Sequence, residues 1–277
     1  MPFQFFIVAT PIGNLSDISL RALEVLKGVD YIACEDTRVT KILLDKYDIN
    51  AKLLDCHKFN EKERSSRIIS LIKEGKKISL VSDAGTPLIS DPGAVLINEL
   101  IENDIKITSI PGACAVSAFL SLLPRKTEEY AFIGFIPRNK KRQIDILNKY
   151  KYTNCVFYES PNRLMETLKN IKSAFGSDTK ISVGRELTKI FEEVKTGNIS
   201  DIIEHYENNP LKGEITAMVW AKETSDISDD KLQAKIDILK EEGFSPKDIS
   251  KIISGLYSEN KNKIYKMTLN KKEQCNV

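Results

Sequence analysis

The sequence carries five loops that contain glycine or proline or directly follow a glycine, as expected where a backbone turns sharply beside a ligand. The longest, Ser82–Gly93, also holds carboxylates, and so does Tyr158–Arg163. Any one such loop is most often ordinary turn chemistry. Five on one chain, two of them with carboxylates, indicate a ligand site. The other three loops are Thr10–Leu15, Pro111–Ala115 and Arg185–Lys189.

The elements that must position these loops alternate between strand-like apolar runs and amphipathic helices. Alternation of this kind predicts an α/β layer structure with a largely parallel sheet. Ligands bind at the carboxyl ends of the strands in such sheets, where the loops fall. Strands are predicted at Phe3–Ala9, Tyr31–Cys34, Leu53–Leu54, Ile78–Val81 and Ile105–Ile110. Helices are predicted at Ser19–Lys27, Thr37–Lys46, Glu61–Glu74 and Gly93–Glu102.

The same pattern restarts near Pro124 and ends in a stretch of helices alone. We therefore expect an N-terminal α/β domain over residues 1–122, a C-terminal α/β domain over 123–222, a polar linker over 223–230 and a helical tail over 231–277. Second-domain strands are predicted at Tyr130–Gly134, Asn154–Tyr158, Ile181–Gly184, Glu192–Thr196 and Ile215–Trp220. Helices are predicted at Lys140–Lys149, Asn162–Phe175, Ile199–Tyr206, Asp230–Glu242, Pro246–Tyr257 and Lys261–Leu269.

Composition restricts the class of protein. The 277 residues are 42% hydrophobic and 29% charged, as in globular proteins. No apolar run reaches the ~18–20 residues that span a bilayer, and the N-terminus lacks a basic signal region, so we expect a cytoplasmic protein. The five cysteines form no C-x-x-C pair, so we expect reduced thiols in the core. A net charge of +2 does not by itself indicate a nucleic-acid binder.

The usual nucleotide motifs are absent: the sequence has no G-x-G-x-x-G and no G-x-x-x-x-G-K-[ST]. The ordered motifs that are present resemble the ribosomal RNA small subunit methyltransferase I family of the tetrapyrrole methylase-like superfamily. The resemblance runs from Phe6 to about Trp220 and extends into the helical tail. Its motifs are Ile7–Leu15, Cys34–Arg38, the H-x-x-N-E run His57–Glu61, Val81–Gly93, Ile110–Gly112, Phe157–Pro161 and Gly184–Lys189.

This resemblance implies more than the spacing of residues shows. It implies two α/β domains of the tetrapyrrole methylase type, with S-adenosylmethionine in the cleft between them and a homodimer as the usual state. It also implies methyl transfer to a cytidine ribose 2′-oxygen in the decoding region of small-subunit ribosomal RNA, free or in the assembled 30S subunit. Gly112-Ala113-Cys114 departs from the family's usual Gly-Pro-Ser, so we expect no serine-mediated cofactor bond at Cys114.

Carried over position by position, the resemblance also predicts where the cofactor binds. The tetrapyrrole enzymes open with a G-x-G-P-G-D type loop, which this chain replaces with Thr10–Leu15. The cofactor carries a positively charged sulfonium, which the aromatic face of Phe157 or Tyr158 would attract. Either ring could equally pack in the core. The predicted cofactor-binding residues are Pro11, Asp83, Gly85, Ser117, Phe157, Tyr158, Gly184 and Ala217.

Methyl transfer from a sulfonium needs an acceptor for the hydroxyl proton and needs no metal, and the sequence shows no metal-ligand cluster. The catalytic residues predicted are Glu35, Asp36 and His57, with Asp83 and Glu159 as further candidates for the proton acceptor. His57 has a suitable unperturbed pKa of about 6.5. Asp36 could instead cap the next helix. We favour Glu35 or Asp36, acting with Arg38 on the RNA.

RNA contact requires positive charge that faces phosphate. The densest basic run, Arg138–Arg142, follows a predicted strand and loop and should be exposed, although such a run is often only a solvated face. Lys58 and the tail lysines, including Lys271 and Lys272, add to the positive charge. The RNA-binding residues predicted are Arg38, Arg138, Lys140, Lys141, Arg142 and Arg185.

Two other functions fit the same sequence. A methylase of this fold could act on a tetrapyrrole or a diphthine-like small acceptor, without RNA. Alternatively, the chain could be a ribosome-assembly protein that binds RNA and transfers no methyl group. Activity on a small acceptor would favour the first alternative, and RNA binding that is independent of the cofactor would favour the second.

Overall fold

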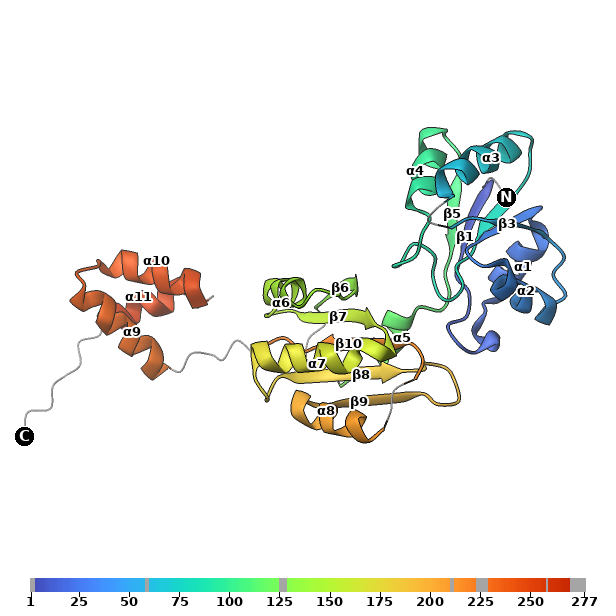
Figure 1. The fold of residues 1–277 in the computed structure, drawn as a ribbon. Coiled ribbons are helices and arrows are strands. Elements are labelled where there is room, and N and C mark those ends of the chain that lie inside the picture. Colours follow the sequence, from blue (N-terminus) through green and yellow to red (C-terminus); the bar gives the residue numbers. More distant parts are fainter. Residues whose placement is uncertain are drawn as a thin grey trace, which may run out of the picture. The chain divides into compact units, whose positions relative to one another are not determined.

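The computed structural model describes residues 3–57, 60–124, 129–209, 212–222, 229–257 and 259–269. The chain divides into two compact units, Met1–Trp220 and Ala221–Val277. The first unit contains two α/β lobes, which we call the N lobe (β1–β5) and the C lobe (β6–β10) (Figure 1). The second unit is helical. Within the described residues, no helix is long and apolar enough to cross a membrane.

The N lobe is built on a five-stranded sheet of order β3-β2-β4-β1-β5. Every neighbouring pair is parallel, so the predicted parallel sheet is confirmed. All five strands therefore end at one edge of the sheet, and the loops that follow them meet there. The strands are β1 (Phe5–Val8), β2 (Tyr31–Cys34), β3 (Lys52–Asp55), β4 (Ile78–Leu80) and β5 (Ile107–Ile110).

Two pairs of helices cover the two faces of this sheet (Figure 1). Successive strand side chains point to opposite faces, so Phe6 packs with the first helix pair and Phe5 with the second. The first pair is α1 (Leu20–Gly28) and α2 (Thr37–Lys46), and the second is α3 (Glu61–Lys73) and α4 (Ala94–Glu102). A short 3-10 helix, η1 (Leu15–Asp17), precedes α1.

Side-chain caps begin most of these helices. The Ser19 hydroxyl accepts the backbone N–H of Ala22 at the start of α1. Helix α4 follows Gly93, which has no side chain to provide such a cap. The buried carboxylate of Glu61 on α3 instead accepts the backbone N–H of Leu96 at 3.0 Å. Glu61, the last residue of the H-x-x-N-E motif, therefore joins α3 to the start of α4.

The C lobe has a mixed sheet of order β6-β7-β10-β8-β9, in which only β6 and β7 run parallel. Its strands are β6 (Tyr130–Phe135), β7 (Asn154–Glu159), β8 (Lys180–Arg185), β9 (Glu193–Asn198) and β10 (Ile215–Val219). The helices α6 (Lys140–Lys149), α7 (Pro161–Phe175) and α8 (Ile199–Asn208) cover one face.

The other face of the C-lobe sheet packs against α5 (Ala115–Ser121), a helix that the sequence did not predict. Its seven residues are too few for a helical period to stand out. Val116, Phe119 and Leu120 of α5 join Val156 and Met218 in one core cluster. Helix α5 thus follows the last N-lobe strand but packs on the C-lobe sheet.

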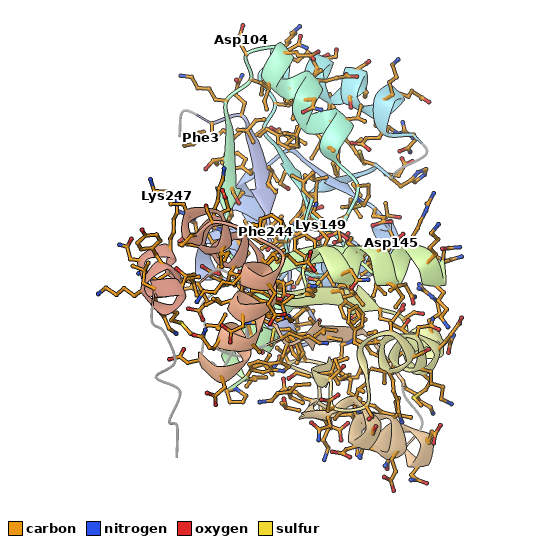
Figure 2. The ribbon with its side chains drawn as sticks, turned by 90° about the vertical axis from the view of Figure 1, so that its left-hand side faces the viewer. Phe3, Asp104, Asp145, Lys149, Phe244 and Lys247 are labelled. Atoms are coloured by element: carbon orange, nitrogen blue, oxygen red, sulfur yellow. The ribbon has the colours of Figure 1, made fainter. Side chains whose placement is uncertain are left out.

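The second unit is a small bundle of α9 (Asp229–Glu241), α10 (Pro246–Tyr257) and α11 (Lys261–Leu269). Its own core contains Leu232, Ile236, Ile249, Ile253 and Ile264. At the start of α10, Ser245 accepts the backbone N–H of Asp248, and Phe244 and Lys247 lie on the surface beside it (Figure 2). Residues 223–228 of the predicted linker and the predicted RNA contacts Lys271 and Lys272 lie outside the described residues.

Candidate active site

A cavity of about 450 Å³ lies between the two lobes of the first unit, and both lobes line it. Four of the five loops singled out in the sequence contribute to it, which confirms that these four converge. The N lobe supplies Ile12, Asp83–Thr86, Ile89–Asp91, Cys114 and Ala115. The C lobe supplies Phe135, Tyr158–Pro161 and Gly213–Thr216.

The loop Ser82–Gly93 forms much of the N-lobe wall and has unusual backbone geometry. Leu88 and Ser90 have φ values of 72° and 73°, a region that side chains rarely occupy. Such conformations persist only where the surroundings enforce them, and they gather at functional sites. Two backbone hydrogen bonds of 2.8 and 3.0 Å between Thr10 and Gly85 fasten this loop to the end of β1.

A second fixed loop, Arg185–Lys189, joins the lobes at the side of the cavity. The Thr188 hydroxyl accepts the backbone N–H of Asn14 from the N lobe at 3.2 Å. A side chain at Gly13 would place its Cβ 2.5 Å from the Lys189 side chain and 2.9 Å from the Leu187 carbonyl. Only glycine allows the two loops to come so close.

The same loop also shapes the C-lobe wall of the cavity. The Glu186 carboxylate accepts the Lys189 ammonium at 3.0 Å and the backbone N–H of Glu214 at 3.2 Å. A Cβ on Gly213 would collide with that carboxylate, and Gly213 has a φ of 84°. Gly213 and Glu214 line the cavity, so the Gly184–Lys189 motif holds part of its wall from behind.

Glu159 lies at the cavity but its carboxylate is already occupied. It is buried, and it accepts the Thr167 hydroxyl and the Ser160 backbone N–H, each at 2.7 Å. Arg163 completes the set with an ion pair of 3.1 Å. These partners occupy both carboxylate oxygens. Glu159 therefore fixes the start of α7, which favours a structural role over the proton acceptor considered from the sequence.

Asp91 is the cavity carboxylate with the most unusual environment. Burial raises its pKa to about 6, and the polar side chain of Ser82 beside it opposes that rise. The nearby charges of Glu35, Asp83 and Glu214 raise the pKa further. Within the described part of the chain, no lysine, arginine or histidine forms an ion pair with Asp91.

A second, more open hollow adjoins the cavity, and Asp83 belongs to the walls of both. The Asp83 carboxylate accepts the backbone N–H of Asp36 at 3.1 Å, which joins the ends of β4 and β2. This hollow brings together all three predicted catalytic residues and Arg38. Its lining is Glu35, Asp36, Thr37, Arg38, Asp55, His57 and Asp83.

The two adjacent carboxylates after β2 differ in their environment. Asp36 caps α2: it accepts the backbone N–H of Arg38 at 2.8 Å and forms an ion pair with the Arg38 side chain at 2.6 Å. Hydrogen bonds from the Arg38 side chain and backbone lower the pKa of Asp36 to about 2, so it is a weak base. Burial, and secondly the Asp83 charge, raise the pKa of Glu35 and make it the better proton acceptor of the two.

His57 belongs to a turn that its own motif stabilises. The Asn60 side chain accepts the His57 backbone N–H at 2.8 Å and donates to Asp55 at 2.8 Å. Arg64 binds the same Asp55 carboxylate at 2.8 Å. The asparagine of the H-x-x-N-E motif therefore stabilises the turn, and the turn places His57 in the hollow. The predicted RNA contact Lys58 lies outside the described residues.

Three of the predicted cofactor-binding residues, Asp83, Gly85 and Tyr158, line the cavity. Burial raises the pKa of Tyr158, so its hydroxyl stays neutral and can donate a hydrogen bond. Pro11 lines a smaller hollow that also touches Asp83. Ser117 lies on the exposed side of α5 and outside the cavity lining.

The other three predicted cofactor-binding residues lie in the packed interior. Phe157 and Ala217 are buried in the core between the C-lobe sheet and its helices, so core packing accounts for Phe157. A Cβ on Gly184 would lie 2.6 Å from the Phe119 ring, so this glycine allows α5 to approach the sheet. None of the three is among the residues that line the cavity.

The predicted RNA-binding residues fall into two groups. Arg138, Lys140, Lys141 and Arg142 are exposed where the chain enters α6, three residues or more beyond the cavity residue Phe135. Arg185 is instead half-buried and forms an ion pair of 3.0 Å with Glu193 across β8 and β9. Its place favours a role in the sheet over contact with RNA.

The sequence analysis did not single out several of the lining residues. Asp91 and Thr86 belong to the longest motif, but the order of residues alone does not show which of its side chains face inward. Residues 213–216 carry no motif, and they reach the cavity because β10 is the central strand of the C-lobe sheet. The structure also places Cys114 in the wall of the cavity.

Together these features define what the site can do. The cavity offers apolar walls and an uncompensated carboxylate, which suit a ligand that is part ring system and part cation. The hollow beside it offers a carboxylate that can accept a proton. Because Asp83 lines both the cavity and the hollow, a ligand bound in the cavity could react with a group bound in the hollow next to it.

Comparison with known proteins agrees with this arrangement. The family model described as tetrapyrrole (corrin/porphyrin) methylases matches residues 4–203. A solved diphthine synthase superimposes with a TM-score of 0.64 and 14% identity, covering 79% of this chain and 89% of that one. A cobalt precorrin-4 methyltransferase gives a TM-score of 0.60 and 17% identity over 78% and 94% of the two chains. The fold is that of the tetrapyrrole methylase class.

Sequence relatives narrow the assignment. A protein of Buchnera aphidicola is 39% identical over 97% of both chains. A protein of Mycoplasmopsis pulmonis is 45% identical over 79% of this chain and 99% of its own length. Both carry the name ribosomal RNA small subunit methyltransferase I. The chain belongs to the ribosomal RNA small subunit methyltransferase I family.

Proposed function

We propose that this chain transfers a methyl group from S-adenosylmethionine to the ribose 2′-hydroxyl of a cytidine in the decoding region of small-subunit ribosomal RNA. One observation carries the proposal: a cavity suited to a cationic nucleoside and an acidic hollow share Asp83 as a common wall. Membership of the family supports the RNA substrate.

The residues of the cavity fit the cofactor. S-adenosylmethionine combines an adenine ring with a sulfonium and an ammonium, and when bound it supplies an electrophilic methyl carbon. Apolar side chains such as Ile12 and Ile89 would pack against the ring. Asp83 and Asp91 would offset the positive charge, since a buried cation needs a partner.

The acceptor then enters through the hollow. Alignment of the ribose oxygen with the methyl carbon and the sulfur supplies a large part of the rate in such a displacement. Arg38 on the rim of the hollow would hold an RNA phosphate. As the new oxygen–carbon bond forms and the carbon–sulfur bond breaks, Glu35 accepts the hydroxyl proton and the sulfur retains the bonding electron pair.

RNA binds, in this proposal, along the basic face that begins α6. Arg138, Lys140, Lys141 and Arg142 are exposed there and attract the phosphate backbone. Lys149 adds a positive charge in the last turn of the same helix (Figure 2). The basic run lies next in the chain to the β6 end that lines the cavity, so bound RNA would lie close to the reacting groups.

The substrate we propose is small-subunit ribosomal RNA in the cytoplasm, free or in the assembled 30S subunit, with the enzyme acting as a homodimer. Two neighbouring apolar side chains support a self-association surface: Ile190 is 95% exposed and Phe191 is 71% exposed. Large apolar side chains this exposed, on a loop held by the Asn14–Thr188 hydrogen bond, often mark an interface.

Transfer of a labelled methyl group tests the function. Purified protein is incubated with the labelled donor and either assembled small subunits or naked ribosomal RNA, and the label is mapped by resistance to alkaline cleavage. A 2′-O-methyl group blocks that cleavage, so a protected cytidine in the decoding region is the expected result. Label in a small tetrapyrrole acceptor, or no label in either RNA despite bound cofactor, would contradict the proposal.

A further inference from the structure

Two of the four carboxylates that line the cavity have a cationic partner, whereas Asp83 and Asp91 form no ion pair among the described residues. Glu159 is paired with Arg163, and Glu214 is paired with Lys189 at 3.1 Å. Asp91 is more enclosed than Asp83, which faces the open hollow as well as the cavity. The cavity therefore contains one enclosed negative charge that the described part of the protein leaves uncompensated. A ligand of opposite charge would remove that imbalance.

The position of Asp91 shows which part of a ligand it would meet. Asp91 and Asp83 line the cavity from the same loop, and Asp83 also lines the hollow that would take the acceptor. The charge of Asp91 interacts with those of Glu35, Asp83 and Glu214. It also influences Tyr158 on the C-lobe wall. Asp91 thus lies toward the junction of cavity and hollow. The methyl group must cross this junction, so the sulfur that carries it must be near the same place.

We propose that the Asp91 carboxylate faces the sulfonium of S-adenosylmethionine, so that the cavity selects the charged methyl donor over S-adenosylhomocysteine, the neutral thioether left after transfer. This inference rests on the proposed function. The ammonium and carboxylate of the amino-acid part are present in both molecules, so the sulfonium is the charge that distinguishes them. Loss of that charge leaves Asp91 unpaired again and favours release of the product.

The same contact has a kinetic consequence. An anion beside the sulfonium stabilises the bound donor, and its effect weakens as the positive charge disperses in the transition state. Asp91 should therefore lower the KM for the donor without raising kcat. A residue needed only for the shape of the loop would affect both ligands and both kinetic constants.

Calorimetric titration of the full-length protein with each of the two ligands tests the inference. In Asp91→Asn we expect the Kd for S-adenosylmethionine to rise about tenfold, because one close charge pair is lost, and the Kd for S-adenosylhomocysteine to stay nearly constant. Glu207→Gln is the matched control: it removes a carboxylate outside the cavity that is paired with Lys169 at 2.9 Å, so the ratio of the two Kd values should not change.

A pH series on the unaltered protein gives a measurement that does not depend on the folding of any variant. The groups that face Asp91 are Ser82, Tyr158 and the carboxylates Glu35, Asp83 and Glu214. Because the pKa of Asp91 is raised to about 6, the carboxyl is charged at a pH well above that value and loses its charge as the pH falls below it. The preference for the charged ligand should fall over the same range, and this fall should be absent in Asp91→Asn.

The results separate the two proposals. Equal weakening of both ligands in Asp91→Asn, or a ligand preference that does not change with pH, would overturn the role of Asp91 while leaving the function intact. Failure of the unaltered protein to bind either ligand would instead count against the proposed function.

Discussion

At the scale of single residues, the environment decides the chemistry of neighbouring groups of the same type. Glu35 and Asp36 are consecutive carboxylates after β2, yet the pKa of Glu35 is raised and that of Asp36 is lowered to about 2. Asp36 holds the first turn of α2 and the Arg38 side chain. Partial burial and the charge of Asp83 raise the pKa of Glu35 instead, so Glu35 binds a proton more readily than Asp36 does.

Replacing Glu35 with glutamine tests the assignment of the proton acceptor. We expect kcat for RNA methylation to fall by about 10²–10⁴-fold, as is typical when a general base is lost, with little change in cofactor affinity. Asp36→Asn should have a much smaller effect, since asparagine also caps helices well. Single-turnover methylation rates measure both.

The pH dependence of the same rate gives a further check. Glu35 must be deprotonated to accept the proton, so the rate should fall as the pH drops through its raised pKa. That fall should disappear in Glu35→Gln. A rate for Glu35→Gln close to that of the unaltered enzyme would assign the proton acceptor to another group.

At the scale of elements, close packing brings the loops of the candidate active site together. Helix α5 follows the N-lobe sheet in sequence but packs on the C-lobe sheet, where the Phe119 ring lies over Gly184. Phe119 is buried, and the opposite end of α5 reaches the cavity through Ala115. The distance between α5 and β8 therefore helps to set the shape of the cavity.

Gly184→Ala tests this packing. Its Cβ would lie 2.6 Å from the Phe119 ring, so the ring or the helix must move. We expect the free energy of unfolding to fall by about 1–3 kcal/mol, the usual cost of overpacking a core. Gly28→Ala is the control, because a Cβ at this position, the end of α1, would have nothing within 4 Å. Denaturant titrations that place the two variants at the same midpoint would refute the argument.

At the scale of the whole molecule, the two units have separate cores. The first unit ends at Trp220, and the second has its own apolar core. The Mycoplasmopsis pulmonis relative is matched over 99% of its length by only 79% of this chain, about the share of the first unit. The Buchnera aphidicola relative is matched by 97% of this chain, so its match extends into the helical unit.

A chain ending at Lys222 should therefore fold and bind the cofactor as the full chain does, because both walls of the cavity lie in the first unit. We expect its affinity for ribosomal RNA to fall, since the tail lysines are lost, and the salt dependence of binding to become weaker. Calorimetry with the cofactor and filter binding with RNA at several salt concentrations measure the two effects. Loss of cofactor binding in the shortened chain would show that the helical unit supports the cavity.

Local patterns in the sequence were sufficient to place most elements. The helices predicted at Thr37–Lys46, Lys140–Lys149, Pro246–Tyr257 and Lys261–Leu269 have the bounds found in the structure. Apolar periodicity and capping residues act within a few residues of one another, so the sequence records them directly. The parallel N-lobe sheet also followed from alternation of strands and helices.

The tertiary structure alone decided the features that depend on distant residues. Contacts between segments far apart in the chain determine three of these features. They are the mixed strand directions of the C-lobe sheet, the packing of α5 on that sheet and the position of Asp91 in the cavity wall. The sequence could not separate Tyr158, which lines the cavity, from Phe157, which is buried in the core. Adjacent strand residues point to opposite faces, and which face meets a ligand is settled only when the two lobes pack.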